Sequence, residues 1–316
     1  MIRFIKFFIL GVLLLPLIST AHAELSQHNE FRMDVNGVTR TFQIHYPAPA
    51  PVNLKNGLPL VVVLHGGRSS GEQIAKASRF SAKADKHGFI TVYPDGTGKV
   101  EGRRLTWNAG ECCDIAMKEN AQDKAFIANL IDYMVKFQGA DPRRVYIAGM
   151  SNGGMLAHRL AAELAPKIAA VGVVEGGMFA SQPTPTEPVS ILIMHGERDK
   201  NVPYEGGPSK SSLITPYMKS EETAFLPVQS VFDFWREKNG CRDDMTTEKK
   251  GRITTNIYRQ CRNNTVTVLQ TLQNGGHNWP GSSKMLYSEF DDGSNYMGHD
   301  ATDILWDFFA QQRKNP

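Results

Sequence analysis

The sequence has little that would indicate a metal, a nucleic acid or a large extra domain. It contains four cysteines in 316 residues, and none forms a Cys-x-x-Cys pair or accompanies a histidine pair at ligand spacing. We therefore expect no metal site. The formal net charge is only +3, and no basic cluster with interleaved aromatic residues is present, so we expect no nucleic-acid partner.

Internal repeats, low-complexity tracts and Thr- or Pro-rich linkers are also missing from the sequence. These absences exclude a repeat protein and give no sign of an appended binding module. The 41% of hydrophobic residues suffices for a large core. We therefore expect one catalytic-size domain over residues 24–316.

The first 23 residues have the pattern of a secretory signal peptide. Arg3 and Lys6 precede an apolar run that ends in Ala-His-Ala at residues 21–23. Pro16 interrupts this run, which is shorter than the roughly 20 residues of a membrane span, so cleavage is expected and not anchoring. The mature chain then has a net charge of +1. We expect it to be secreted or periplasmic, without membrane contact after the signal is removed.

All four cysteines lie in the exported part, where an oxidising compartment allows disulfides to persist. Cys241 and Cys261 precede two adjacent predicted strands, and we expect a disulfide that closes a loop of about 20 residues. Cys112 and Cys113 are neighbours in the sequence. A vicinal disulfide, two free thiols and crossed pairs with the later cysteines are all open for them.

Short apolar runs alternate with segments of helical periodicity along the chain. Strands are predicted at 40–46, 58–64, 89–93, 145–148, 169–174, 191–194, 253–258 and 265–272, and helices at 74–87, 124–137, directly after residue 151, at 228–238 and at 301–311. This order predicts an α/β fold, a doubly wound, mostly parallel sheet with helices on both faces. The polar stretch 201–226 is too long for a simple connection and is expected to be a lid or rim loop.

Residues 144–155, Arg-Val-Tyr-Ile-Ala-Gly-Met-Ser-Asn-Gly-Gly-Met, place Gly-x-Ser-x-Gly between an apolar strand and a helical pattern. This pattern predicts a nucleophile elbow, in which a sharp turn presents the hydroxyl of Ser151. Gly149 and Gly153 are required to be small because the strand and the helix nearly touch. The amide of Asn152 opens the helix, which makes it a predicted oxyanion-hole donor.

A second glycine-rich turn, Leu-His-Gly-Gly-Arg at residues 64–68, follows another predicted strand. Its glycines allow the backbone to approach a substrate carbonyl closely. We predict that Gly67 is the second oxyanion-hole donor, with a plain glycine turn as the alternative.

The predicted acid and base also follow predicted strands, where ligands bind in open α/β sheets. Asp199 is the candidate acid, with Glu197 as its nearest competitor, and His195 is expected to be structural. His277 lies in the glycine-flanked loop Gly-Gly-His-Asn-Trp-Pro and is the candidate base. The order serine, acid, histidine is that of α/β-hydrolases and not that of chymotrypsin-like or subtilisin-like proteases.

Two tryptophans lie close to these motifs. Trp279 is two residues from His277, and Trp107 lies five residues before the neighbouring cysteines Cys112 and Cys113. We expect both to flank the cleft and to contact an acyl group, and core packing is the alternative for each.

Segments 107–113, 141–155, 195–207 and 275–281 resemble the secreted poly(3-hydroxybutyrate) depolymerase and feruloyl esterase-like family of α/β-hydrolases. The resemblance spans most of the mature chain. It implies Ser151 as nucleophile, Asp199 as acid and His277 as base of a serine esterase that needs no cofactor. Depolymerases that act on solid polymer often carry a linker and a substrate-binding domain. Neither is found here, which argues against solid polymer but not against an esterase. The resemblance implies hydroxyalkanoate oligomers or feruloyl-type esters as substrates.

Two other functions are compatible with the same residues. A serine peptidase uses the same chemistry on amides, although no propeller or gating domain is present to support it. A binding module that kept a hydrolase fold is the other alternative, because a fold does not by itself fix a function. The presence of Ser151, Asp199 and His277 together argues for an enzyme.

Overall fold

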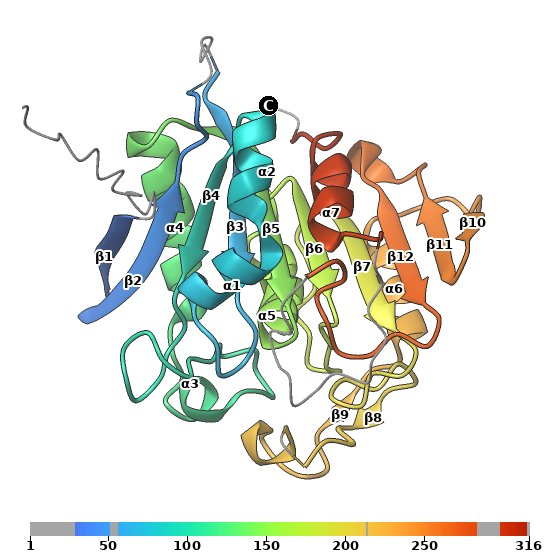
Figure 1. Cartoon of the computed structure of the whole chain (residues 1–316). Coiled ribbons are helices and arrows are strands. Elements are labelled where there is room, and N and C mark those ends of the chain that lie inside the picture. The colour runs from blue at the N-terminus through green and yellow to red at the C-terminus, as the bar shows by residue number, and fades with distance from the viewer. Residues whose placement is uncertain (1–28, 51–55, 213, 283–297, 315–316) are drawn as a thin grey trace, which may run out of the picture.

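The computed structural model describes residues 29–50, 56–212, 214–282 and 298–314 (Figure 1). The predicted signal peptide lies outside the described residues. Within the described ranges, no helix combines the length and the apolar character that crossing a membrane requires.

A ten-stranded sheet forms the centre of the molecule, in the order β1-β2-β4-β3-β5-β6-β7-β12-β11-β10 (Figure 1). The strands from β4 to β12 in this order run parallel, and the outer two strands at each edge pair antiparallel. The bounds are β1 (Asn29–Val35), β2 (Val38–His45), β3 (Leu58–Leu64), β4 (Ile90–Pro94), β5 (Ala140–Met150), β6 (Ala170–Val174), β7 (Ser190–Gly196), β10 (Thr246–Lys250), β11 (Ile253–Tyr258) and β12 (Thr267–Leu272).

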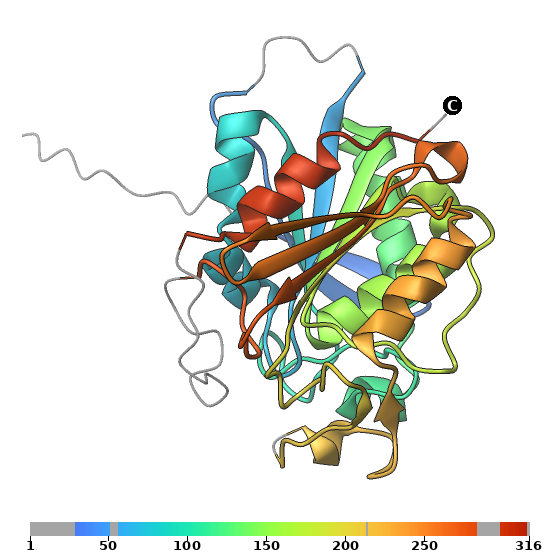
Figure 2. The same ribbon diagram turned by 90° about the vertical axis from the view of Figure 1, so that its right-hand side faces the viewer.

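Helices cover both faces of the sheet. In the turned view, α1, α2 and α7 lie on one face and α4, α5 and α6 on the other (Figure 2). The bounds are α1 (Gly71–Ser78), α2 (Phe80–His87), α3 (Asp114–Lys118), α4 (Asp123–Phe137), α5 (Asn152–Glu163), α6 (Val228–Lys238) and α7 (Ala301–Phe309). The predicted α/β fold, a mostly parallel sheet between two helical layers, is confirmed.

The apolar composition of the central strands follows from this two-sided cover. In β3, Val62 and Leu64 join the core beneath α4, α5 and α6, whereas Val61 and Val63 join the core beneath α1, α2 and α7. Successive side chains of a strand point to opposite faces, so a strand covered on both sides must be apolar at every position. Burial of each such side chain contributes about 1.5–3 kcal/mol.

The predicted helix at 74–87 is wrong in one respect, because it consists of the two helices α1 and α2. Arg79 between them has φ 58°, which ends the first helix. Its guanidinium bonds the Gly281 carbonyl at 2.9 Å and the Asp300 carboxylate. Both partners of Arg79 lie about 200 residues further along the chain. The local sequence pattern therefore does not show that the helix ends at Arg79. The edge strands β1 and β10 and the short helix α3 were not predicted either.

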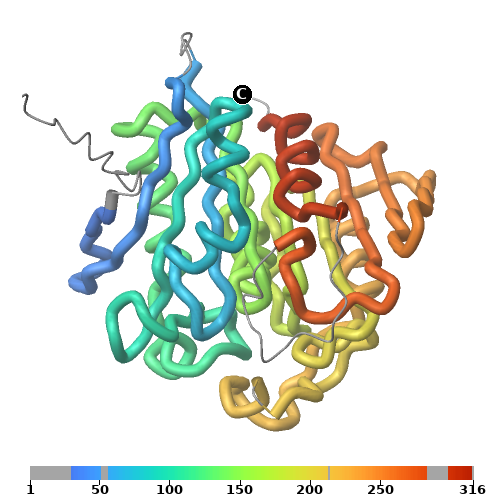
Figure 3. The backbone as a smooth tube through the Cα atoms, viewed as in Figure 1, coloured from blue at the N-terminus to red at the C-terminus, as the bar shows by residue number. Residues whose placement is uncertain are grey.

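The polar stretch 201–226 forms a rim at the carboxyl end of the parallel strands. It carries η2 (Thr215–Tyr217) and the two-residue strands β8 (Gly207–Pro208) and β9 (Ala224–Phe225). In Figures 1 and 3, this stretch and the loop with α3 lie at the same lower end of the sheet, to which the loops after β7 and β12 also run. An apolar cluster joins the rim to that loop, and it includes Met218, Phe225 and both neighbouring cysteines.

The cysteines form two disulfides. The predicted pair Cys241–Cys261 is confirmed, and Cys112 and Cys113 form a vicinal disulfide. The Cys112–Cys113 bond is the vicinal disulfide, one of the three alternatives that the sequence leaves open.

Candidate active site

The turn between β5 and α5 holds Ser151 in the backbone geometry expected of a nucleophile elbow. Ser151 has φ 52° and ψ −121°, and its amide donates to the Val174 carbonyl at 2.9 Å. A Cβ on Gly149 would lie 2.3 Å from the Gly153 carbonyl oxygen, and one on Gly153 would lie 2.4 Å from the His65 carbonyl oxygen. No side chain fits at either glycine, so the sequence pattern has a steric cause.

A hydrogen-bonded chain links Ser151, His277 and Asp199. The distance from Ser151 Oγ to His277 Nε2 is 2.8 Å, and that from His277 Nδ1 to Asp199 Oδ2 is 2.7 Å. Because a carboxylate only accepts, Nδ1 carries the proton and Nε2 accepts from the serine hydroxyl. The three side chains are buried and follow strands β5, β7 and β12.

Asp199 is held as an oriented carboxylate. Its Oδ1 accepts from the amides of Asn201 at 2.7 Å and Val202 at 2.9 Å, so Oδ2 is left for His277. Burial alone would raise the pKa of Asp199, but its hydrogen bond and attraction to His277, together with His195 and the Val202 amide, hold this pKa below its usual range. The acid is therefore ionised at neutral pH.

Glu197 and His195, which are close to Asp199 in the sequence, lie outside the hydrogen-bonded chain. Glu197 is exposed and accepts from the Asn274 amide at 3.2 Å, away from the hydrogen-bonded chain. His195 is fully buried, and its Nε2–H donates to the Val202 carbonyl at 2.9 Å. Burial lowers the pKa of His195 despite the attraction of Asp199, so the ring stays neutral. These contacts agree with the expectation that His195 is structural.

The two expected oxyanion donors lie beside each other. A Cβ on Gly67 would be 3.6 Å from Asn152 Cβ, and the Asn152 amide is at the first position of α5. Among the described residues, neither amide donates to another protein group. Two free N–H groups next to a serine hydroxyl can receive a negatively charged oxygen.

Trp107 and Trp279 are buried side chains, as the core-packing alternative requires. Trp107 is fully buried; its Nε1 donates to the His65 carbonyl at 2.9 Å, and its amide donates to Asn152 Oδ1 at 2.7 Å. Trp279 is 3% exposed, packs on the Phe80 ring and donates to Thr302 Oγ1 at 3.2 Å. Trp107 thus ties the loop after β4 to the turn after β3 and to the start of α5.

Glu175 is a buried residue of the site that the sequence analysis missed. It follows β6 with φ 51°, and its two carboxylate oxygens accept from the Gly196 amide at 3.0 and 3.1 Å. His195 Nε2 lies 3.6 Å from one of these oxygens. A charged residue at the end of the apolar run 170–174, directly before two glycines, is the signal that marks it.

Glu175, His195 and Asp199 bring possible metal-ligand atoms within 4.8 Å of one another. The atoms through which the three residues approach one another, His195 Nε2 and the carboxylate oxygens, are already engaged, however. His195 Nε2 carries the proton donated to Val202, and both Asp199 oxygens accept hydrogen bonds. A cation would have to displace these bonds, so we assign the cluster to support of the acid loop.

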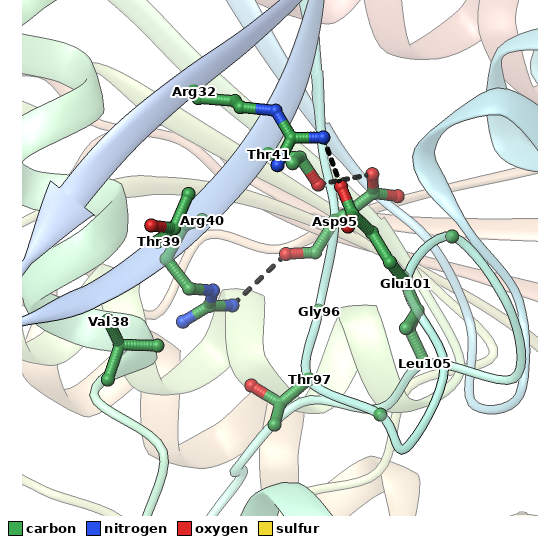
Figure 4. A pocket seen from close by; sticks show the side chains of 12 residues that line it. Arg32, Val38, Thr39, Arg40, Thr41, Asp95, Gly96, Thr97, Glu101 and Leu105 are labelled. Carbon is green, nitrogen blue, oxygen red and sulfur yellow. Dashed lines mark hydrogen bonds and ion pairs between the residues drawn. The ribbon is translucent and has the colours of Figure 1, made fainter.

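A separate pocket of about 230 Å³ lies between β2 and the loop after β4 (Figure 4). Its charged groups pair with the protein. Arg40 donates to the Asp95 carbonyl at 3.0 Å, and Arg32 bonds Glu101 at 2.6 Å. The residues of the hydrogen-bonded chain do not line this pocket.

Comparison with known proteins identifies the family of this chain. Residues 42–203 match the family model described as esterase PHB depolymerase. The chain is 32% identical over 263 residues to NocK, an inferred esterase of Nocardia uniformis subsp. tsuyamanensis, covering 79% of this chain and 73% of that protein. It is 28% identical to feruloyl esterase B of Piromyces equi, covering 69% of this chain but only 39% of that enzyme.

Two further matches are a depolymerase that aligns over a shorter stretch and a solved structure of lower identity. Poly(3-hydroxybutyrate) depolymerase of Ralstonia pickettii is 30% identical over 45% of this chain and 30% of its own length. Among solved structures, an acetyl xylan esterase from Aspergillus awamori superimposes with a TM-score of 0.54 at 16% identity, covering 79% of this chain and 94% of that one, which shows the shared fold. On the family match and the similarity to NocK, this chain belongs to the esterase family of PHB depolymerases.

Proposed function

We propose that this chain is a serine esterase in which Ser151 is the nucleophile, His277 the base and Asp199 the acid that orients the base. The hydrogen-bonded chain from Ser151 through His277 to Asp199 is the observation that carries this proposal. The order of these residues along the chain and the family supply independent support.

The reaction proceeds in two steps. His277 Nε2 takes the hydroxyl proton as Ser151 Oγ attacks the ester carbonyl, and the same proton then passes to the departing alcohol. A water molecule, deprotonated by His277, next attacks the acyl-enzyme and releases the acid. Asp199 stabilises the imidazolium in both steps because its carboxylate accepts from Nδ1–H.

The amides of Gly67 and Asn152 form the oxyanion hole in this mechanism. Both are free of protein acceptors, and the Asn152 amide lies at the positive end of the α5 dipole. Removing one such donor typically lowers turnover about 100- to 1,000-fold. No cofactor takes part in the proposed steps.

The proposal extends to the substrate, the compartment and the domain. Hydroxyalkanoate oligomers and feruloyl-type esters are the proposed substrates, in keeping with the names of the relatives. The signal-like residues 1–23 and the Cys241–Cys261 disulfide support an exported enzyme whose catalytic domain spans residues 24–316.

The test is hydrolysis of p-nitrophenyl butyrate by the Ser151→Ala variant. Loss of the nucleophile is expected to reduce turnover about a millionfold, because the three residues act as a unit. The matched control is Ser81→Ala. The Ser81 hydroxyl lies on α2 and bonds the Tyr93 hydroxyl, so this variant should retain activity. A serine-directed phosphonate should label Ser151 alone, and a peptide panel should show no cleavage. Activity of Ser151→Ala close to that of the wild type would refute the assignment.

A further inference from the structure

Arg68 carries a positive charge that no carboxylate of the described residues neutralises. It directly follows Gly67, and among the described residues no hydrogen bond or ion pair involves its guanidinium. Its Nε is buried and has no acceptor. A buried donor that stays unpaired lowers stability by about 1–3 kcal/mol, so its retention calls for an explanation.

The arginines of the nearby pocket provide the contrast. Arg32 and Arg40 are each neutralised by a carboxylate, Arg32 by Glu101 at 2.6 Å and Arg40 by Asp123 at 2.7 Å. Both arginines line that pocket (Figure 4). Among the described residues no carboxylate lies within ion-pair distance of Arg68, so none of them neutralises its charge.

The backbone of Arg68 is fixed in a conformation that glycine would adopt at lower cost. Its φ is 62°, and the next residue is tied to the loop after β4, because the Leu105 amide donates to the Ser69 carbonyl at 2.9 Å. A non-glycine residue in the left-handed region costs of order 1 kcal/mol. The backbone that carries the Arg68 side chain is therefore kept in a conformation that lowers the stability of the fold.

Tyr217 of the rim orients the guanidinium. Arg68 Cζ lies 5.6 Å from the centroid of the Tyr217 ring. Stacking of this kind occupies the face of the guanidinium and leaves its N–H groups in the plane free. Such a fork matches the two oxygens of a carboxylate. An arginine that directly follows Gly67, stacks on the rim residue Tyr217 and has no carboxylate partner among the described residues is thus suited to an anionic group on the substrate.

We propose that Arg68 is a specificity-determining residue that binds a free carboxylate of the substrate, so that the preferred substrates are esters carrying a carboxylate close to the scissile bond. The terminal unit of a hydroxyalkanoate oligomer has this chemistry, whereas a simple feruloyl or acetyl ester of a sugar does not. The inference rests on the proposed function, since it concerns the substrate of the same site.

The experiment compares matched pairs of esters in the purified full-length mature protein. The first pair is the 3-hydroxybutyrate dimer and its terminal primary amide, which places the charge on the alcohol side. The second pair is p-nitrophenyl hemisuccinate and p-nitrophenyl butyrate, which places it on the acyl side. We expect kcat/KM to favour the charged member of at least one pair about 10- to 100-fold, the range of a charge-assisted hydrogen bond.

Variants of Arg68 and its surroundings show whether this residue sets the preference. Arg68→Met should bring the ratio of charged to neutral ester close to one, Arg68→Lys should keep part of it, and Tyr217→Phe should keep most of it. The matched control is Arg242→Met, an exposed arginine bonded to Gln260, which should leave the ratio unchanged. Raising the NaCl concentration should slow only the charged ester, because salt screens the attraction.

The outcomes separate the two proposals. Hydrolysis of p-nitrophenyl butyrate with no preference for the charged member of either pair overturns the inference about Arg68 and leaves the esterase intact. An unchanged ratio in Arg68→Met also overturns it. If Arg68→Met does not fold, the Lys variant and the salt dependence of the wild type decide. Failure to hydrolyse any of the four esters refutes the proposed function itself.

Discussion

At the scale of single residues, the two carboxylate oxygens of Asp199 have different partners. Oδ1 accepts from two backbone amides and Oδ2 from His277, and this difference predicts the effect of Asp199→Asn. The amides of Asn201 and Val202 require an acceptor at Oδ1. The new Asn NH₂ group must then face His277, where it can only donate. His277 Nδ1 would have to become the acceptor, which moves the ring proton to Nε2 and prevents the base from accepting the serine proton.

We expect Asp199→Asn to lower kcat for p-nitrophenyl butyrate about 10⁴-fold, with little effect on the melting temperature. The control is Glu197→Gln, which changes the same charge two residues away on an exposed side chain. Its activity should match that of the wild type. The reverse result, with Glu197→Gln inactive and Asp199→Asn active, would transfer the role of the acid to Glu197.

The residue scale also shows where sequence analysis stops. Ser151, Asp199 and His277 could be named because each follows a predicted strand and has a side chain of typical catalytic chemistry. Trp107 and Trp279 could not be placed, because burial depends on packing between distant segments; Trp107, for example, bonds His65 from another loop. Arg68 was not predicted as a site residue, because the lack of a carboxylate partner among the described residues is visible only in the folded chain.

At the scale of secondary structure, the central strands were predictable and the edges were not. The prediction for β3 matches its bounds, because a strand covered on both faces is apolar at every position. In β10, by contrast, all the residues Thr246–Lys250 are exposed, so no apolar pattern marks that strand. Pairing with β11 alone holds it in the sheet.

The Cys241–Cys261 disulfide joins the segment after α6 to the segment after β11, across a sequence separation of 20 residues. Closing a loop of this size stabilises the folded chain by roughly 3 kcal/mol in the chain-entropy model. We therefore expect the double variant Cys241→Ser, Cys261→Ser to lose about this much free energy of unfolding, measured by urea denaturation.

The matched control for that loss is the double variant Cys112→Ser, Cys113→Ser. Neighbouring cysteines close almost no loop, so the entropic contribution of their disulfide is smaller. Equal losses of unfolding free energy in the two double variants would contradict the loop-closure explanation. A larger loss for Cys112 and Cys113 would indicate that packing in the rim cluster dominates instead.

At the scale of the whole molecule, the topology explains why the site could be anticipated. The strands that precede Ser151, Asp199 and His277 are β5, β7 and β12, which lie close together in the parallel part of the sheet. Their carboxyl ends meet at one edge, so residues far apart in the sequence come together. The rim was expected only as a loop, because its contacts with the α3 segment are tertiary.

Two buried, neutral histidines make the stability of this fold depend on pH. His65 and His158 are fully buried, and burial lowers the pKa of His65 to about 4 and that of His158 to about 3. Each ring also accepts a hydrogen bond in its neutral form, His65 from the Gly96 amide at 2.9 Å and His158 from Trp235 Nε1 at 3.1 Å. Protonation would break these bonds.

The direction of the pH effect follows from proton counts. An unfolded histidine has a pKa of about 6.5, so between pH 6.5 and 4 the unfolded chain binds more protons than the folded one. Stability is complete above this window and falls as the pH is lowered through it. The loss approaches roughly 1.4 kcal/mol per pH unit for each such histidine once the unfolded ring is protonated.

The variant His158→Gln isolates one of these contributions from those of the carboxylates. Glutamine can still accept from Trp235 but does not titrate, so the free energy of unfolding should fall less steeply between pH 6 and 4 than in the wild type. Denaturation at several pH values measures the slope. His87→Gln, a change at an exposed histidine, should keep the wild-type slope. If His158→Gln also kept that slope, a protonated His158 would have to be tolerated in the folded core, contrary to its burial beside Trp235.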